Sequence, residues 1–329
     1  MVRLREAPAD LATLVGLTAD SLRIDAGFVE KDFWVIEVLR AATSGAQITA
    51  KDGKKYPVQT IFKGGTSLSR AFNLIERFSE DVDLLVSFPD VDTSVSARDK
   101  SLKAIRDAVN THLGIEGTSV SSTTGIKRNV RYAYPTQQQG STISAGVLLE
   151  MGSRGGNHPL VECDLRSWVA EYAITELNDP PTRWEEYDPV HVDVLAPERT
   201  LLEKVALLHD GMSRHPDDKA TVKLLTGGRH LYDIHKLLGS ADVVSALRNL
   251  GPEGIAELCA DIDSYSEAAD FSFTPRPEGG FCAGPLLNAD APATDVLRQA
   301  YNAAESLIYG PRPTFEECMQ TLKDNAELL

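Results

Sequence analysis

The chain has 329 residues, 42% of them hydrophobic and 25% charged, with a formal net charge of −15 at pH 7. This length exceeds one small hydrophobic core and predicts two domains of a globular protein. No run approaches the roughly 18 uncharged apolar residues of a membrane span, and the N-terminus lacks the features of a secretory signal. We therefore expect a cytoplasmic protein with no membrane partner.

The N-terminal half alternates helical and strand-like patterns, which predicts an α+β domain. Apolar spacing predicts helices over residues 9–24, Val29–Ala42, Thr66–Ile75 and Arg98–Leu113. Short apolar runs predict strands at Val58–Phe62, Val82–Val86, Val130–Tyr134, Ile143–Met151, Leu160–Asp164 and His191–Val194.

The C-terminal half is predicted to be mostly helical. Pro197 suits the first turn of a helix that runs to His209. Lys219–Leu238 holds one or two helices, interrupted near Gly227 and Gly228, and helical patterns continue beyond Asp242. The expected domains are therefore residues 1–195 and residues 196–329.

A Lys-Gly-Gly-Thr-Ser segment follows the strand predicted at Val58–Phe62. It comprises Lys63, Gly64, Gly65, Thr66 and Ser67. Two glycines between a strand and a helix let the backbone approach a phosphate, while the helix N-terminus favours an anion. The two hydroxyls could add donors. Such a turn alone is usually a plain connection, and it lacks the P-loop spacing.

An Asp-x-Asp pair, Asp81 and Asp83, follows the helix predicted after the glycines. Alternate residues of a strand share a face, so the two carboxylates point the same way. Like charges this close repel unless a cation neutralises them, and oxygen ligands suit Mg²⁺. Together with the glycine turn, this layout resembles the DNA polymerase β-like nucleotidyltransferases.

The resemblance extends further and narrows to one family. Lys63–Val86 is similar to the AbiEii/AbiGii toxin-like (MenT-type) nucleotidyltransferases. Four other segments resemble that family in the same order: Val29–Val35, Leu149–Arg154, Val194–Lys204 and Gly228–Ile234. The last ninety or so residues match nothing that we can name. The resemblance implies a polymerase β-like core with a mixed sheet, followed by a helical C-terminal domain.

Four of the five matched segments supply a candidate role. Nucleotidyl transfer attacks the α-phosphate of an NTP and releases pyrophosphate, so Asp81 and Asp83 are expected to bind Mg²⁺. A third carboxylate should lie on a neighbouring strand. Glu150 is our first candidate and Asp164 the second.

The C-terminal domain is expected to contribute two residues to the cleft. Lys204 would neutralise the triphosphate, as the family match favours, although a lone helical lysine is usually at the surface. Asp233 would be a further active-site acid. Arg229 is four residues from Asp233 on the predicted helix, so the two could pair; Arg229 is also a candidate for nucleotide binding. Ser79 is a candidate regulatory site, because its modification would disturb metal binding at Asp81.

The acceptor is implied by the resemblance alone. It predicts the toxin of a type IV-like toxin–antitoxin pair, with a cognate antitoxin as partner and RNA, at the tRNA 3′ end, as acceptor. The acidic charge opposes this reading, since phosphate binding usually needs a basic face. We therefore expect a local basic patch facing the site, formed by Lys54, Lys55, Lys127, Arg128 and Arg131.

Three alternatives stay open. The acceptor could be a small molecule or a protein hydroxyl, and an acidic protein would suit a cationic acceptor such as an aminoglycoside. The chain could be a catalytically silent binding partner, although the intact Asp81, Asp83 and Lys204 oppose this. A metal phosphohydrolase built on His209 and Asp210 would need further histidines, which we cannot place.

Overall fold

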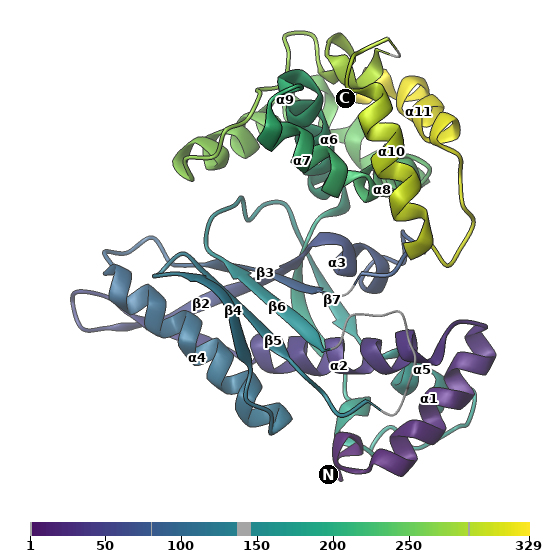
Figure 1. Ribbon diagram of the computed structural model, residues 1–329. Coiled ribbons are helices and arrows are strands. Elements are labelled where there is room, and N and C mark those ends of the chain that lie inside the picture. Colours follow the sequence, from purple (N-terminus) through teal and green to yellow (C-terminus); the bar gives the residue numbers. More distant parts are fainter. Residues whose placement is uncertain (1, 80, 137–145, 289) are drawn as a thin grey trace. The chain divides into compact units, whose positions relative to one another are not determined.

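The computed structural model of the chain describes residues 2–79, 81–136, 146–288 and 290–329. The chain forms two compact units (Figure 1). Unit 1 comprises Met1–Ala71 and Glu80–Val194, and unit 2 comprises Phe72–Ser79 and Leu195–Leu329. A single cut near residue 195 therefore does not describe the division, because the short segment Phe72–Ser79 belongs to the C-terminal unit.

Unit 1 is built on a mixed sheet, which confirms the predicted α+β class. In the described residues its eight strands follow the order β4-β5-β6-β3-β2-β8-β7, and β1 pairs with β2 outside this path. Strand β2 is antiparallel to β3 and parallel to β8, while β3 is parallel to β6. The strands are β1 (Ala46–Thr49), β2 (Lys55–Lys63), β3 (Asp81–Ser87), β4 (Thr118–Thr123), β5 (Lys127–Tyr132), β6 (Val147–Gly152), β7 (Leu160–Leu165) and β8 (Val190–Leu195).

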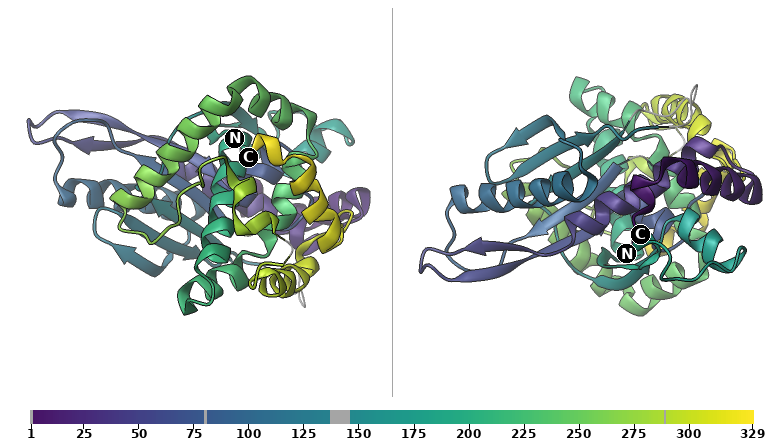
Figure 2. Two further views of the ribbon diagram at one scale, coloured as in Figure 1. Left: turned by 90° about the horizontal axis from the view of Figure 1, so that it is seen from above. Right: turned by 90° about the horizontal axis from the view of Figure 1, so that it is seen from below.

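Helices of unit 1 cover one face of this sheet. The helices are α1 (Pro8–Leu22), α2 (Ala26–Ala42), α3 (Gly64–Arg70), α4 (Val95–Leu113) and α5 (Trp168–Thr175). Helix α2 packs on β3 and β6, and α4 packs on β5 (Figure 2, right). Helix α2 begins after Asp25, whose side chain accepts from the Gly27 amide at 2.8 Å and caps the helix.

Unit 2 is helical, as expected. Its helices are α6 (Pro197–Arg214), α7 (Asp218–Gly227), α8 (Arg229–Leu238), α9 (Ala241–Ala268), α10 (Thr294–Ala304) and α11 (Phe315–Asp324). Helix α8 buries Leu231, Ile234 and Leu237, the spacing of an amphipathic helix. Helix α9 bends at Gly251, which has a positive φ of 66° and precedes Pro252. In the part of the chain that is described, no helix combines the length and apolarity that crossing a membrane requires.

Two local expectations differ from the structure. The predicted helix Thr66–Ile75 ends at Arg70, because the following residues pack in unit 2: the Phe78 amide, for instance, donates to the Leu307 carbonyl at 2.8 Å. Strand β4, a run of Ser and Thr around one Val, was not expected. Residues 143–145 of the strand predicted at Ile143–Met151 lie outside the described residues.

Candidate functional site

Three carboxylates lie side by side on one face of the sheet in unit 1. Asp81 and Asp83 begin β3, with Val82 buried between them on the other face. In the parallel pair of β3 and β6, Asp83 is directly opposite Glu150 and Asp81 is opposite Leu148. Glu150, our first candidate for the third carboxylate, is therefore the cross-strand neighbour of Asp83.

A polar row crosses the sheet at this level. Glu150 is also opposite Asn129 on β5, and Asp83 is opposite Lys63 on β2. The Asn129 side-chain amide donates to Glu150, and Glu150 shares a hydrogen bond with Asp83. The row therefore runs Asn129, Glu150, Asp83, Lys63 over four adjacent strands, and its residues share the face opposite α2 and α4.

The electrostatics of this row favour a cation. Burial raises the pKa of Glu150 to about 7, and the negative charges of Asp83 and Asp81 add to the rise. Neighbouring carboxylates oppose one another's ionisation in this way until a positive charge compensates them. The described residues include no group of three His, Cys, Asp or Glu side chains that could hold a metal ion by itself. Oxygen donors from Asp81 and Asp83 fit Mg²⁺, which commonly takes one or two carboxylates and completes its shell with water and substrate phosphates.

The glycine turn approaches Asp83 closely. Gly64 has a φ of +82°, and a Cβ built on it would lie 2.3 Å from Oδ2 of Asp83. A side chain at this position would strain the backbone and displace this carboxylate. The hydroxyls of the turn do not match the expectation that they donate to a phosphate. Thr66 donates to the Asp81 carbonyl at 2.6 Å and Ser67 to the Gly64 carbonyl at 2.9 Å, and both side chains are buried. They fix the turn against β3.

Unit 2 contains a second cluster, which is centred on Asp233 of α8. Arg77 binds both carboxylate oxygens, with Nε at 2.6 Å and Nη2 at 2.7 Å. Lys204 of α6 approaches the same carboxylate at 2.8 Å, and its Nζ lies 3.3 Å from Nδ1 of His230. Asp233 is 0% exposed, so this is a buried ion cluster with a bidentate arginine.

The charges of this cluster depend on one another. Burial opposes the ionisation of Asp233, but Arg77 and Lys204 outweigh it and hold the pKa of Asp233 well below its usual value. Burial lowers the pKa of Lys204, and Asp233 counteracts the shift. Burial and the Lys204 charge lower the pKa of His230, so the imidazole stays neutral and its Nδ1 can accept a hydrogen bond from the Lys204 ammonium. The cluster holds the Lys204 amine in one place.

The remaining predicted residues are distributed more widely. Arg229 is exposed at the start of α8, whereas its expected partner Asp233 is bound by Arg77 and Lys204. Ser79 is half-buried in the segment before β3. Asp164, the second candidate for the third carboxylate, lies on β7, three strands from β3, and is hydrogen-bonded to His191. Glu150 is thus the better placed of the two candidates.

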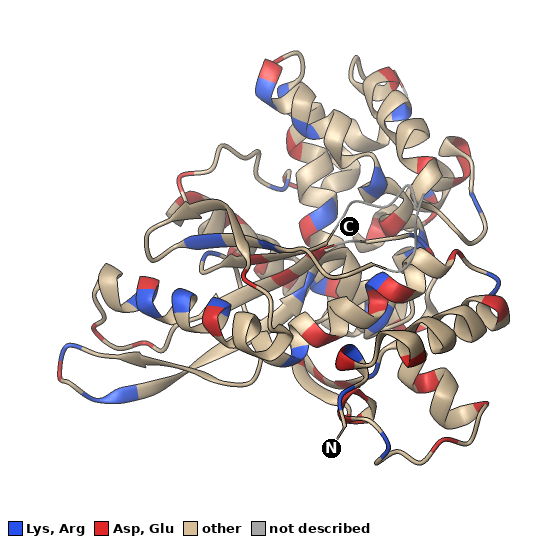
Figure 3. Cartoon of the chain, turned by 60° about the horizontal axis from the view of Figure 1, so that its bottom comes forward, with Lys and Arg blue, Asp and Glu red and all other residues tan. Residues whose placement is uncertain are grey.

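The expected five-residue basic patch is wrong in two respects. Arg128 is 8% exposed and pairs with Asp99 of α4 at 2.9 Å, on the opposite face from the carboxylates. The strand pairing places Lys127 in line with Ile61 of β2 across the sheet. Lys55, at the start of β2, is six residues from Ile61 along the strand. At ~3.3 Å per residue, that separation is about 20 Å. Figure 3 shows basic and acidic residues interspersed in both units.

Sequence reasoning missed Asn129 and Arg77. The strand that we expected began at Val130 and therefore left Asn129 out. A strand that begins at Lys127 places Lys127, Asn129 and Arg131 on one face, because alternate residues of a strand share a face. Arg77 precedes Asp81 by four residues, but nothing in the local pattern reveals that its partner is Asp233.

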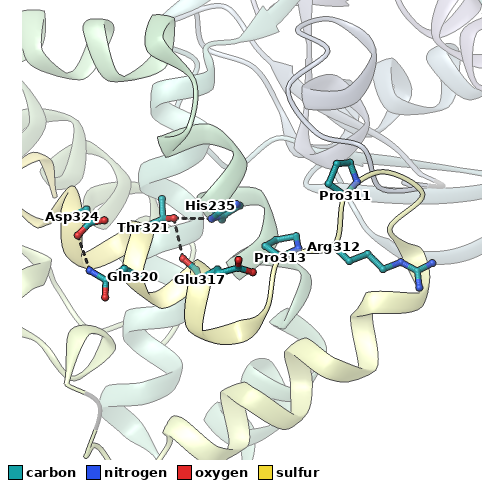
Figure 4. A pocket seen from close by; sticks show the side chains of 8 residues that line it. All are labelled: His235, Pro311, Arg312, Pro313, Glu317, Gln320, Thr321 and Asp324. Atoms are coloured by element: carbon teal, nitrogen blue, oxygen red, sulfur yellow. Dashed lines mark hydrogen bonds between the residues drawn. The ribbon is translucent and has the colours of Figure 1, made fainter.

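Two other features of unit 2 are the pair His209 and Asp210, considered above for a metal phosphohydrolase, and a pocket beside α8. Asp210 is neutralised by Arg214 and Lys223 at 3.5 and 3.2 Å, and His209 packs edge-on against Phe281. A pocket of about 470 Å³ lies between α8, α11 and the segment around Arg312. In it His235 is hydrogen-bonded to Thr321 (Figure 4). None of the residues predicted for the site lines this pocket.

The chain is similar to known proteins in both sequence and fold. The family model described as "Nucleotidyl transferase AbiEii toxin, Type IV TA system" matches residues 54–321. The solved structure of the nucleotidyltransferase toxin MenT4 (Rv2826c) from Mycobacterium tuberculosis H37Rv is similar with a TM-score of 0.55 at 17% identity, covering 95% of this chain and 89% of that chain. This likeness shows the fold. JHP933 from Helicobacter pylori gives a TM-score of 0.31 at 15% identity, over 89% of this chain and 90% of that chain. None of the curated proteins matches the sequence.

Proposed function

Because this chain belongs to the AbiEii family of nucleotidyltransferase toxins of type IV toxin–antitoxin systems, we propose that it uses Mg²⁺ to transfer a nucleotide from an NTP to the 3′ end of tRNA. The family implies a divalent metal, a nucleotide substrate and an antitoxin as partner. The observation that carries the proposal is the row of Glu150, Asp83 and Lys63 across three adjacent strands, with Gly64 against Asp83. We place the reaction in the cytoplasm.

The reaction is a displacement at phosphorus. The acceptor hydroxyl forms a bond to the α-phosphorus, the bond to the β-phosphate oxygen breaks, and pyrophosphate leaves. Mg²⁺ held by Asp81 and Asp83 would neutralise charge on the phosphates. Glu150 accepts the hydroxyl proton or completes the metal site. Its place next to Asp83 supports either role.

The other proposed residues bind the nucleotide. Lys63 and the backbone from Gly64 to Ser67 approach the phosphates beside Asp83, with Thr66 and Ser67 holding the turn. Lys204 neutralises the triphosphate, and Asp233 holds its amine. Arg229, which is exposed on α8, adds a second cation. We propose that these groups from unit 2 act in the same reaction, and the family segments that contain them support this.

The RNA acceptor follows from accessibility and from the family. A tRNA 3′ end is single-stranded, so no duplex has to be opened before the hydroxyl reaches the carboxylates. The net charge of −15 favours a cationic small molecule instead, and an experiment has to decide between them.

The test is to incubate the purified chain with each α-labelled NTP, Mg²⁺ and either total RNA or a panel of small-molecule and protein acceptors. We expect label in tRNA, and we expect Asp83→Asn to reduce it at least about 100-fold, or about 2.7 kcal/mol in activation free energy. Asp92→Asn is the matched control, since Asp92 is an exposed acid paired with Lys51. Label in a small molecule alone, or full activity of Asp83→Asn, would refute the proposal.

A further inference from the structure

The β4–β5 hairpin forms the edge of the sheet beside Glu150. Its register pairs Thr118 with Arg131, Ser121 with Asn129 and Thr123 with Lys127. Directly paired residues share a face, and Asn129 is hydrogen-bonded to Glu150. All six side chains therefore belong to the carboxylate face of the sheet, and we call them the hairpin face.

The opposite side of β5 is covered by α4. Arg128 pairs with Asp99 there, and the Tyr132 hydroxyl donates to the Arg106 carbonyl at 3.2 Å. Val130, between them, is fully buried. Every residue of β4 and the side chain of Lys127 are exposed. On β5, the side that is open to a ligand is therefore the hairpin face.

The composition of the hairpin face stands apart from the rest of the chain. It has two cations, one amide and three hydroxyls, and no acid, although the chain holds 48 acidic residues against 33 lysines and arginines. All six groups can donate hydrogen bonds. Lys127 and Arg131 are four residues apart on one strand, which separates them by about 13 Å. Such a row of donors fits an extended chain of anions.

Asn129 adds an independent sign of a ligand. It is 4% exposed, and its Oδ1 has no hydrogen-bond partner among the described residues. A buried carbonyl oxygen without a donor is costly, and this one belongs to the side chain that holds Glu150. A ribose hydroxyl is the donor that an RNA end would bring to this position.

We propose that the hairpin face binds the sugar–phosphate backbone of the RNA acceptor, with Lys127 and Arg131 at phosphates and Asn129 at the terminal ribose. The inference rests on the proposed function, because it takes the acceptor to be RNA. The RNA then lies on the hairpin face, and Lys54, Lys55 and Arg128 are not part of this surface.

The first test measures RNA binding by the full chain without NTP, using a labelled single-stranded RNA that ends in the tRNA 3′ sequence. Lys127→Ala combined with Arg131→Gln should weaken binding at least about 10-fold. It should also reduce the slope of log affinity against log salt by about 1.4, because two phosphate contacts are lost. Lys55→Ala is the matched control, an exposed lysine of the same sheet, and should bind as the wild type does.

The second test measures transfer. The double variant should raise the KM for RNA about 10-fold while the KM for NTP stays unchanged, which also shows that the variant is folded. Asn129→Ala should lose the preference of the wild type for a ribose over a 2′-deoxyribose end. Unchanged RNA binding in the double variant overturns the inference, as does loss of antitoxin binding with RNA binding intact. If the wild type binds RNA through this face but labels none, the proposed function fails separately.

Discussion

Gly64 shows how one residue couples the backbone to the chemistry of the site. Its positive φ and its contact with Asp83 are separate constraints, because the first concerns the backbone alone and the second concerns the space for a side chain. Gly53, in the turn between β1 and β2, has nearly the same φ of +83° but nothing within 4 Å of a Cβ. The two glycines therefore allow the constraints to be separated.

We expect Gly64→Ala and Gly53→Ala to cost similar backbone strain, about 1 kcal/mol each in the free energy of unfolding. Only Gly64→Ala should reduce nucleotidyl transfer, by about 100-fold, because the new methyl group displaces the Asp83 carboxylate. Chemical denaturation and initial rates with labelled NTP measure the two effects. Equal activity of both variants would show that the close approach to Asp83 has no role in the reaction.

At the scale of elements, the short segment Phe72–Ser79 belongs to unit 2, although the residues on both sides of it in the chain belong to unit 1. It carries Arg77 into the buried cluster of unit 2, and the Tyr232 hydroxyl accepts from the Glu76 amide at 3.1 Å. Arg77 and Asp233 are 2% and 0% exposed. Removing one partner of such a pair leaves a buried charge with less compensation.

Arg77→Met should therefore lower the free energy of unfolding by about 3–5 kcal/mol. Combining it with Asp233→Asn should cost less than the sum of the two single changes, because the pair acts as a unit. Arg183→Met, which removes an exposed arginine paired with Asp179, serves as the control and should leave stability nearly unchanged. Urea denaturation gives all four values, and additive effects would contradict the coupling.

Local periodicity explains which parts of this site could be predicted from sequence. The shared face of Asp81 and Asp83 follows from the two-residue repeat of a strand alone, and the family segments identified Glu150. The family match over residues 54–321 confirms that resemblance. The same alternation predicts that Arg128 is buried, which our sequence analysis missed. Arg128 shares a face of the strand with Val130 and Tyr132, which are core residues.

Long-range packing explains the rest. The register that sets Asn129 beside Glu150 depends on how β5 and β6 pair, and neither strand encodes its partner locally. Strand β4 lacks the apolar alternation by which strands are recognised, because all its residues are exposed. The helix predicted over Thr66–Ile75 has suitable local spacing, but Ile75 and Phe78 are buried in unit 2 instead.

At the scale of the whole molecule, the chain passes from unit 1 to unit 2 at Phe72, returns after Ser79, and passes again at Leu195. Each unit is therefore built from two separate stretches of the chain. A fragment that ends at residue 194 still contains Phe72–Ser79 but lacks its hydrogen-bond partners Tyr232, Asp233 and Leu307. Ile75, Arg77 and Phe78, which are 0%, 2% and 8% exposed, would then have no partners from unit 2.

This arrangement predicts how the fragment 1–194 is digested by trypsin. Cleavage after Arg77 should be rapid in the fragment and slow in the full chain, because a protease needs an exposed, locally unfolded segment. Lys54 and Lys55, which are exposed at the start of β2, provide the internal control and should be cut at equal rates in both proteins. Mass spectrometry of a time course identifies the sites. If Arg77 were as protected in the fragment as in the full chain, the segment would have partners within unit 1, and Asp233 would not be what keeps it folded.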